Sequence, residues 1–487
     1  GTVGWRVPLL ISPFWFLLWM RWERINLIAL FQLWWIFAIG TEIRRLRESA
    51  TDSHAVFCTH LEMLKQWYFV LVGGLLAAAM WFWVQDVAIP HQQADAAALG
   101  IPRGNLSDLY PRWLGARELL LHGRDPYAAD VTRAIQTGYY GRPIDPTRPY
   151  DPKDQQGFAY PVYVVFVLAP TVRLPFAVVQ RGFLWVLIGL TAVSVPLWLR
   201  VLRWRISAPA KIVWIVLLMG SFPAIQGFKL QQLTLLMTAL LAGAMYAVTR
   251  RHLVWAGILL AVASIKPQLI FLLALWLLMW VAGNWRERQR LFWSFAASLV
   301  LLVAGGELLL PGWIGKFRDA SAAYYQYTGG GKSVLDVMLT PLLGRSVAVV
   351  LVATALVLLW RSRHAREDTV DFQWSLCLVL ATTLLVIPMF APYNQLLLVP
   401  VVMLGVRESR RLWAATRLSR FLLGVAAASL LWPWLAAAGL VIALFFLPGP
   451  TVQRAWVLPL LTNFAIPIAL FALVLAVRGN FGAGADG

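Results

Sequence analysis

Charged residues are scarce in this sequence of 487 residues, and so are cysteines. Only 13% of the residues are charged and 60% are hydrophobic, whereas soluble domains carry about 25% charged and about 45–50% apolar residues. So little charge cannot cover a water-facing surface, which excludes a soluble globular fold. The two cysteines, Cys58 and Cys377, exclude a disulfide framework, and neither has metal-ligand residues at a useful spacing. Because the sequence has no Asp-rich metal motif, we expect no metal and no other cofactor.

The excess of basic residues has a different meaning here from the one it has in a soluble protein. A net charge of +19 would suggest a nucleic-acid partner in a soluble chain. In this sequence most of the excess lies in short loops between apolar blocks, where it predicts membrane topology and contact with anionic lipids. No soluble module with interleaved basic and aromatic residues is present, so we expect no nucleic-acid partner.

The apolar residues come in blocks close to the roughly 20 residues that a membrane-spanning helix needs. The sequence therefore predicts an all-α polytopic membrane protein, a bundle of about 12–14 transmembrane helices with short helices in its outer loops. The expected spans lie near residues 68–86, 181–200, 212–226, 229–248, 253–265, 268–282, 291–310, 346–360, 373–388, 394–406, 419–440 and 456–477.

Clusters of Arg and Lys fix the expected orientation. With the spans above, all of the basic runs fall on one side of the membrane, which the positive-inside rule makes cytoplasmic. These runs lie at residues 44–47, 200–211, 250–251, 286–290, 361–366 and 407–420. We expect a multi-pass protein of the inner or plasma membrane, without a cleaved signal peptide in the given sequence.

The chain divides into three expected parts. Residues 1–66 form a membrane-associated hairpin, from the short apolar segments 7–20 and 25–40, and a cytoplasmic connection; helices lying in the membrane interface are the alternative for those segments. Residues 67–478 form the transmembrane domain, with long outer loops at 87–180 and 311–345. Residues 479–487 are a C-terminal tail. The first outer loop predicts short helices near 111–122 and 129–139, and its segment 158–170 is expected to dip toward the bilayer.

Polar residues gather at the outer ends of the expected spans. Asp108 lies early in the first outer loop, Lys266 lies in an outer turn, and Tyr393 and Asn394 lie in another. A further outer turn is expected to hold Gln226, Lys229, Gln231 and Gln232. A carboxylate that faces several cations suits sugar transfer from a lipid phosphate. The carboxylate removes a proton from the attacking hydroxyl, and the cations hold the phosphate that leaves.

Each of these residues also has a structural interpretation that the sequence leaves open. Asp108 can cap the following helix, and Lys266 can extend along a helix end to reach water. The Lys229 turn and the Tyr393–Asn394 pair can serve as ordinary turn and helix-start residues. Two other features are interpreted as structural: the Arg124–Tyr127 segment as a turn, and Glu307 as the partner of an Arg.

Several motifs resemble those of a known family. Residues 107–120, SDLYPRWLGARELL, and 123–127, GRDPY, resemble the first outer loop of glycosyltransferase family 87, the polyprenol-phosphate-mannose-dependent mannosyltransferases of the GT-C superfamily. The resemblance continues through Phe158–Pro161, Leu230–Leu233 and the stretch from Ala256 to Pro267. Some family members have paired His residues where this chain has Pro392–Gln395.

The resemblance implies a GT-C-type fold and a catalytic base at Asp108. Together with the residue pattern it predicts transfer of a sugar, with mannose expected, from a polyprenyl-phosphate carrier to a lipid or glycan acceptor on the non-cytoplasmic face by inverting displacement. Lys266, Lys229 and Arg112 are the expected ligands of the donor phosphate. The sugar or the acceptor is expected to contact Tyr160, Gln231, Asn394 and Tyr393.

Three other functions stay open at this point. A transporter or flippase of lipid-linked sugars would need related halves and polar groups at mid-membrane, and the sequence shows neither. A ligase for diphosphate-linked oligosaccharides would need more cations in the outer loops than a single phosphate does. A non-catalytic subunit of a membrane complex is the third alternative.

Overall fold

The computed structural model describes residues 54–102, 106–145, 147–148, 150–327, 331–388 and 390–482. Contacts divide the chain into Gly1–Phe69 and Val70–Gly487. In the first unit the described residues belong to helix α3 (His54–Phe82), and the predicted hairpin of segments 7–20 and 25–40 lies outside the described residues. All of the regular structure in the described ranges is helical, with no strand.

Within the described residues, six apolar helical stretches are long enough to cross a membrane. The first, Lys65–Ala98, joins α3, a π-helical turn η2 (Trp83–Ala88) and α4 (Ile89–Ala98). Four are single helices: α8 (Phe176–Val201), α14 (Trp285–Leu309), α17 (Pro341–Arg361) and α21 (Arg417–Ala443). The sixth, Gly449–Arg478, contains α22 (Gly449–Gln453), η5 (Leu458–Leu460) and most of α23 (Ala465–Gly482). The predicted all-α polytopic membrane fold is thus confirmed.

The described residues contain fewer full-length spans than the 12–14 helices predicted for the whole chain, of which segments 7–20 and 25–40 lie outside the described ranges. A bent pair, α9 (Ala208–Gly220) and α10 (Phe222–Leu230), raises the count from six to seven if it crosses as one span. Four further apolar helices have only 10–17 residues: α11 (Leu233–Thr249), α12 (Leu253–Ala263), α13 (Pro267–Gly283) and α18 (Val370–Val386). The difference arises because apolar composition predicts burial but does not tell lipid contact from burial against other helices.

The bend between α9 and α10 changes the local prediction for the Gln-rich segment. The helix axis turns by 56° at Ser221, whose extended backbone and side chain cap the start of α10, with Pro223 in its first turn. Gln226 and Lys229 therefore lie inside α10 and not in the expected turn. The turn itself consists of Gln231 and Gln232, and Gln231 ends α10 in the left-handed conformation (φ 49°).

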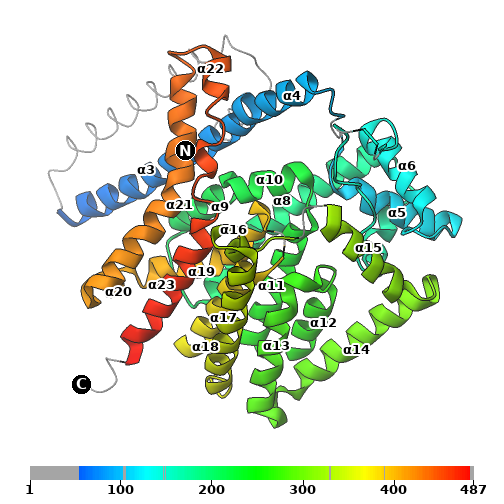
Figure 1. The fold of residues 1–487 in the computed structure, drawn as a ribbon. Coiled ribbons are helices and arrows are strands. Elements are labelled where there is room, and N and C mark those ends of the chain that lie inside the picture. The colour runs from blue at the N-terminus through cyan, green and yellow to red at the C-terminus, as the bar shows by residue number, and fades with distance from the viewer. Residues whose placement is uncertain are drawn as a thin grey trace, which may run out of the picture. The chain divides into compact units, whose positions relative to one another are not determined.

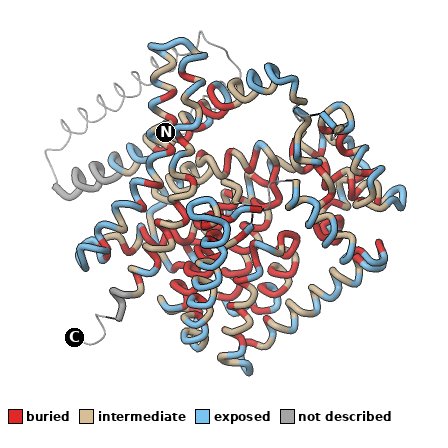
Figure 2. Tube along the Cα trace, viewed as in Figure 1, coloured by how far each residue is buried: buried red, intermediate tan, exposed pale blue. Residues whose placement is uncertain are grey.

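The core lies among the short apolar helices. α18 is buried along almost its whole length, from Phe372 to Leu385, as expected of a helix that is apolar on every face. α12 packs against both α11 and α14, α11 packs against α8, and α18 packs against α13 and α23. Figure 2 shows the buried residues concentrated in these central helices. Two further short helices, α19 (Val399–Arg407) and α20 (Ser409–Ala415), precede α21.

The outer loops are built from short helices. The predicted helices near 111–122 and 129–139 are confirmed as α5 (Leu109–His122) and α6 (Ala129–Tyr140), which pack against one another (Figure 1). At residue 87, the predicted start of the first loop, the chain is still helical and continues through the π-helical turn to Ala98. The segment 158–170 contains α7 (Val164–Leu168) and leads into η3 (Ala169–Thr171); α7 packs on α5.

A second outer segment joins the same region. It contains α15 (Trp313–Tyr327) and α16 (Val334–Met338). Trp313 is buried in one apolar cluster with Leu109, Trp113 and Tyr163, and Phe317 packs against it. The cluster therefore fixes α15 beside α5 and α7, and residues more than 200 positions apart come together there.

Candidate active site

The backbone around Asp108 is tied to the turn between α10 and α11. The Asp108 N–H donates to the Leu230 carbonyl at 3.0 Å, and the Ser107 hydroxyl donates to Gln231 Oε1 at 2.5 Å. The Gln231 amide also donates to the Gln180 carbonyl at the start of α8. These bonds hold the first outer loop in place immediately before Asp108.

The Asp108 carboxylate is not used to cap a helix. Asp108 occupies the N-cap position of α5, yet its side chain accepts no hydrogen bond from that helix. Instead Oδ2 accepts from Gln232 Nε2, and Oδ1 lies 3.4 Å from the Tyr139 hydroxyl on α6. The structural interpretation of Asp108 as a capping residue is therefore wrong, and the carboxylate faces a cluster of polar side chains.

Lys266 lies in the connection between α12 and α13 and is only 7% exposed. Its ammonium donates to Gln232 Oε1 at 3.0 Å and to Thr234 Oγ1 at 2.7 Å. The Tyr160 and Tyr393 rings lie 5.7 and 5.1 Å from Nζ, within range of cation–π attraction. The side chain thus points into the protein and does not extend to water. Burial, together with the nearby Arg112, lowers the Lys266 pKa to about 7, and Asp108 opposes that shift.

Arg112 lies one turn after Asp108 on α5 and is also buried. Its guanidinium donates to the Asp108 carbonyl at 2.6 Å and lies 4.8 Å from the centre of the Tyr160 ring. Nε is buried and has no hydrogen-bond acceptor within the described residues. Burial disfavours the charged form, but Tyr160 and Asp108 outweigh this effect and leave the Arg112 pKa raised. Arg112 therefore stays a cation beside the carboxylate.

The predicted sugar-contacting residues occupy different positions around Asp108, Lys266 and Arg112. Tyr160 lies between Arg112 and Lys266, and its carbonyl accepts from the Tyr127 hydroxyl at 2.6 Å. Tyr393 and Asn394 lie in the 3-10 segment η4 (Pro392–Leu398). Asn394 Oδ1 accepts from Thr234 at 3.3 Å, which places it next to Lys266.

Two other predicted residues differ from these in their surroundings. The Gln231 amide is occupied by Ser107 and Gln180, so it holds the loops in position. Lys229 is exposed on the last turn of α10, unlike the buried Lys266 and Arg112, and its role at the donor phosphate stays a prediction.

The structure adds residues that were not assigned a role from the sequence. Gln232 bonds both Asp108 and Lys266, and Thr234 joins Lys266 to Asn394. Asp154 and Tyr324 lie close enough to Arg112 and Asp108 to interact electrostatically with them. The Gln pair was visible in the sequence as a polar turn, whereas no local pattern marks Tyr324, which reaches the site through the packing of α15.

Two features interpreted as structural have partners of their own. The Arg124–Tyr127 segment is a turn, with the Tyr127 N–H donating to Asp125 Oδ1 at 2.9 Å, and Asp125 also pairs with Lys316 on α15 at 2.8 Å. Glu307 accepts from the Gly312 N–H at 2.7 Å, so it stabilises a turn instead of pairing with the expected Arg. In the described part of the chain no group of three or more His, Cys, Asp and Glu side chains could hold a metal ion.

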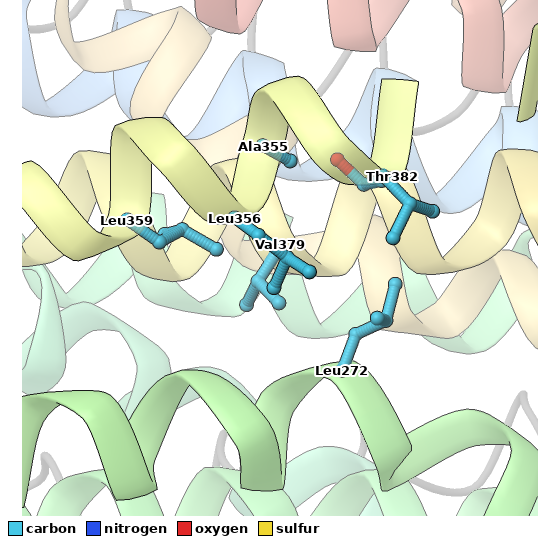
Figure 3. A pocket seen from close by; sticks show the side chains of 7 residues that line it. Leu272, Ala355, Leu356, Leu359, Val379 and Thr382 are labelled. Atoms are coloured by element: carbon cyan, nitrogen blue, oxygen red, sulfur yellow. The ribbon is translucent and has the colours of Figure 1, made fainter. Parts of the chain in front are cut away.

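An apolar gap elsewhere in the bundle contrasts with this cluster. It has about 180 Å³ of empty space between α13, α17 and α18 and is lined by Leu272, Val352, Ala355, Leu356, Leu359, Val379 and Thr382 (Figure 3). The Thr382 hydroxyl already donates to the Leu378 carbonyl at 2.8 Å. The lining of this gap has no carboxylate and no cation, whereas the cluster around Asp108 has both.

Comparison with known proteins identifies the family. Residues 158–388 match the model of Glycosyltransferase family 87, a range that contains Tyr160, Gln232 and Lys266 and begins after Asp108 and Arg112. No curated protein and no solved structure matches the chain. With its multiple membrane-spanning helices, the chain is a membrane glycosyltransferase of family 87.

Proposed function

We propose that the protein transfers a sugar, with mannose expected, from a polyprenyl-phosphate carrier to a hydroxyl of a lipid or glycan acceptor. The reaction takes place on the non-cytoplasmic face by a single inverting displacement. Asp108 is the general base, and Lys266 and Arg112 bind the phosphate. The observation that supports this proposal best is that one amide, Gln232, bonds the Asp108 carboxylate on one side and the Lys266 ammonium on the other.

The displacement needs a base and a cation on opposite sides of one carbon atom. Asp108 removes the proton of the acceptor hydroxyl as its oxygen forms a bond to the anomeric carbon. The bond from that carbon to the phosphate oxygen breaks, and its electron pair leaves with the polyprenyl phosphate. The proton then passes from Asp108 to solvent or to the released phosphate. Lys266 and Arg112 stabilise the charge that grows on the leaving oxygen.

The donor class follows from the cations that are available. The Lys266 ammonium has three N–H groups, of which Gln232 and Thr234 receive two; the described residues supply no third acceptor. Arg112 likewise has a buried Nε without an acceptor in the described ranges. Burying such groups is costly unless a partner arrives. Two buried cations suit one phosphate, which favours a monophosphate carrier over a diphosphate one.

The direct test is transfer of labelled mannose from synthetic polyprenyl-phosphate-mannose by the purified protein in lipid nanodiscs. Octyl α-mannoside and a total polar lipid extract serve as acceptors. Asp108→Asn keeps the shape of the side chain but cannot accept a proton, and we expect transfer to fall about 10²–10⁴-fold. Asp130→Asn is the matched control, because Asp130 is an exposed carboxylate of the same outer loop, paired with Arg124.

The outcomes separate the possible functions. Transfer that survives in a folded Asp108→Asn protein would refute the assignment of the base. No transfer by the wild type from any polyprenyl-phosphate sugar would refute the proposed reaction and favour a transporter or a non-catalytic subunit. Product with the same anomeric configuration as the donor would exclude single inverting displacement. We further propose that no metal is required, so transfer should continue in the presence of EDTA.

A further inference from the structure

The two oxygens of the Asp108 carboxylate have different surroundings. Oδ2 accepts a hydrogen bond from the Gln232 amide. Among the described residues, the hydrogen-bond contact of Oδ1 is with the Tyr139 hydroxyl at 3.4 Å, a distance at which a hydrogen bond between oxygens is weak. One oxygen is thus fixed by the protein, and the other is held loosely on the side of α6.

The orientation of the Gln232 amide follows from its neighbours. A carboxylate only accepts hydrogen bonds and an ammonium only donates them. The NH₂ group must therefore face Asp108, and the carbonyl oxygen must face Lys266, as the structure has them. A side chain with one donor end and one acceptor end is the simplest group that can satisfy both charges at once.

We propose that Gln232 is a positioning residue that divides the active site into a donor side and an acceptor side. It holds Asp108 Oδ2, so Oδ1 is the oxygen that receives the proton of the acceptor hydroxyl. The acceptor, a carbohydrate or polyol headgroup, then binds on the Tyr139 side, while the donor phosphate binds on the Lys266 side. This inference rests on the proposed function and assigns its two substrates to two surfaces.

The acceptor side is formed by a group of tyrosines, here called the tyrosine wall. Its members are Tyr139 and Tyr140 on α6 and Tyr324 and Tyr327 on α15. The first two rings are 4.9 Å apart and the second two are 5.4 Å apart, both edge to face. Tyrosine combines an apolar ring with a hydroxyl that can form hydrogen bonds. A sugar presents the matching pair of features, a C–H face and a rim of hydroxyls.

The tyrosine wall is attached to the protein at several points. The Tyr140 hydroxyl donates to the Asp154 carbonyl at 2.8 Å. At the other end of α15, Trp313 packs edge to face on Tyr163 with ring centres 5.6 Å apart, and Lys316 pairs with Asp125. The charge of Asp154 and the phenol of Tyr140 both contribute to raising the Tyr327 pKa, after burial, which places α15 and α6 on the same side of the site.

The titratable groups that surround Asp108 bear on any pH measurement. The cations are Arg112 on α5 and Lys266 before α13, and the second acid is Asp154. The phenols that interact with Asp108 are Tyr139, Tyr140, Tyr160, Tyr324 and Tyr393. The carboxylates among these groups are Asp108 and Asp154, and the acidic limb of a rate profile is where protonation of carboxylates is observed.

The experiment compares variants of neighbouring residues in the nanodisc assay with labelled polyprenyl-phosphate-mannose and octyl α-mannoside or the polar lipid extract. Gln232→Met keeps the volume of the side chain but loses its donor to Asp108. We expect kcat to fall about 10–100-fold and the acidic limb of kcat/KM to move up by about one pH unit. Gln231→Met is the matched control, because its amide bonds Ser107 and Gln180 and does not touch the carboxylate; its acidic limb should not move.

A second pair of variants tests the acceptor side. Tyr324→Ala should raise KM for octyl α-mannoside about fivefold and leave KM for the donor unchanged. Tyr325→Ala is its control, because it removes the same kind of side chain from the next position of the same helix, and it should change neither value. If Gln232→Met does not fold, Gln232→Glu replaces it, and the added carboxylate should move the acidic limb in the same direction.

Each outcome either supports or overturns the division of the site into a donor side and an acceptor side. A shifted acidic limb in the Gln232 variant alone, together with a selective rise of acceptor KM in Tyr324→Ala, supports the division of the site. An unmoved limb, or equal effects in Tyr324→Ala and Tyr325→Ala, overturns the inference while transfer by the wild type preserves the proposed function. Failure of the wild type to use any polyprenyl-phosphate sugar refutes the proposed function and the inference with it.

Discussion

Two clusters of charged residues, each with a buried cation, lie in different parts of the bundle, and their hydrogen-bonding groups are satisfied in different ways. The Glu367 cluster consists of Arg251, Glu287, Arg288 and Glu367. In it Arg251 pairs with both glutamates, and Arg288, only 5% exposed, donates to the carbonyls of Trp280, Arg363 and Ala365 at 2.7–3.0 Å. The Asp108 cluster consists of Asp108, Arg112, Gln232 and Lys266. Its cations bond an amide, a hydroxyl and a carbonyl, and within the described residues neither cation forms a salt bridge with a carboxylate side chain.

The difference separates a structural charge from a functional one. A buried cation is tolerated when acceptors surround it, and it is costly when they do not. Arg288 has acceptors at the ends of several helices, so its charge stabilises the fold. Lys266 has fewer acceptors and a lowered pKa, so its charge is better explained by a ligand that arrives later. Replacing each buried cation by Met tests this distinction.

Lys266→Met should produce the largest effect on activity. Loss of the ammonium removes a charge-assisted contact to the donor phosphate, and we expect kcat/KM for the donor to fall about 10²–10³-fold. The unfolding temperature should not fall, because Met fills the space without burying a charge. Transfer and thermal unfolding measured on the same nanodisc sample check both statements. A clear loss of stability with little loss of transfer would place Lys266 with the structural charges.

Arg288→Met should behave in the opposite way. It leaves three carbonyl acceptors without their donor, and we expect a loss of about 2–3 kcal/mol of unfolding free energy. Transfer per folded molecule should stay within about twofold of the wild type, because Arg288 belongs to the Glu367 cluster and not to the Asp108 cluster. Chemical denaturation, followed by assay of the folded fraction, measures the two quantities separately. A folded Arg288→Met protein without activity would contradict the comparison.

The sequence predicts the outline of this fold well and its helix lengths less well. Apolar blocks identify the helices, and the turn signals around Gly123 and Gly141 give α5 and α6 to within two residues. The break at Ser221 was missed, because Ser-Phe-Pro inside a long apolar stretch is read either as continuous helix or as a cap. The all-round apolar helix α18 looks the same in sequence whether lipid or protein covers it.

The candidate site was predicted in part. Asp108 and Lys266 were predicted because polar residues gather at the outer ends of the expected spans and because the sequence resembles family 87, and their roles stay predictions. Gln232 could not be separated from Gln231 by sequence, since both are polar residues of one turn. Only the left-handed backbone at Gln231 sends the two amides in different directions, one toward Ser107 and one toward Asp108. Tyr324 depends on the packing of α15, which no local pattern reports.

The dependence of donor KM on pH should be smaller than the effect of Lys266→Met and larger than that of Lys316→Ala. Burial lowers the Lys266 pKa to about 7, so the free enzyme holds the cation below pH 7 and loses it as the pH rises above that value. We expect KM for the donor to rise by up to about tenfold per pH unit above 7, until Arg112 alone holds the phosphate. Lys266→Arg stays charged and should remove this dependence. An unchanged basic limb in Lys266→Arg would assign the limb to another group.

Lys316→Ala should give the smallest effect, and it tests whether a cation that already has a partner also contributes to function. Lys316 pairs with Asp125 at 2.8 Å and connects α15 to the first outer loop, but both side chains are partly exposed. An exposed ion pair contributes below about 1 kcal/mol, so we expect KM for octyl α-mannoside to rise about twofold, with donor KM unchanged. Arg318→Ala is the control, because Arg318 is an exposed cation of the same helix that pairs with its neighbour Asp319. A tenfold rise of acceptor KM would mean that Lys316 itself contacts the acceptor. In that case a cation that already has a hydrogen-bond acceptor would also be functional, and the supply of acceptors would no longer separate the structural charges from the functional ones.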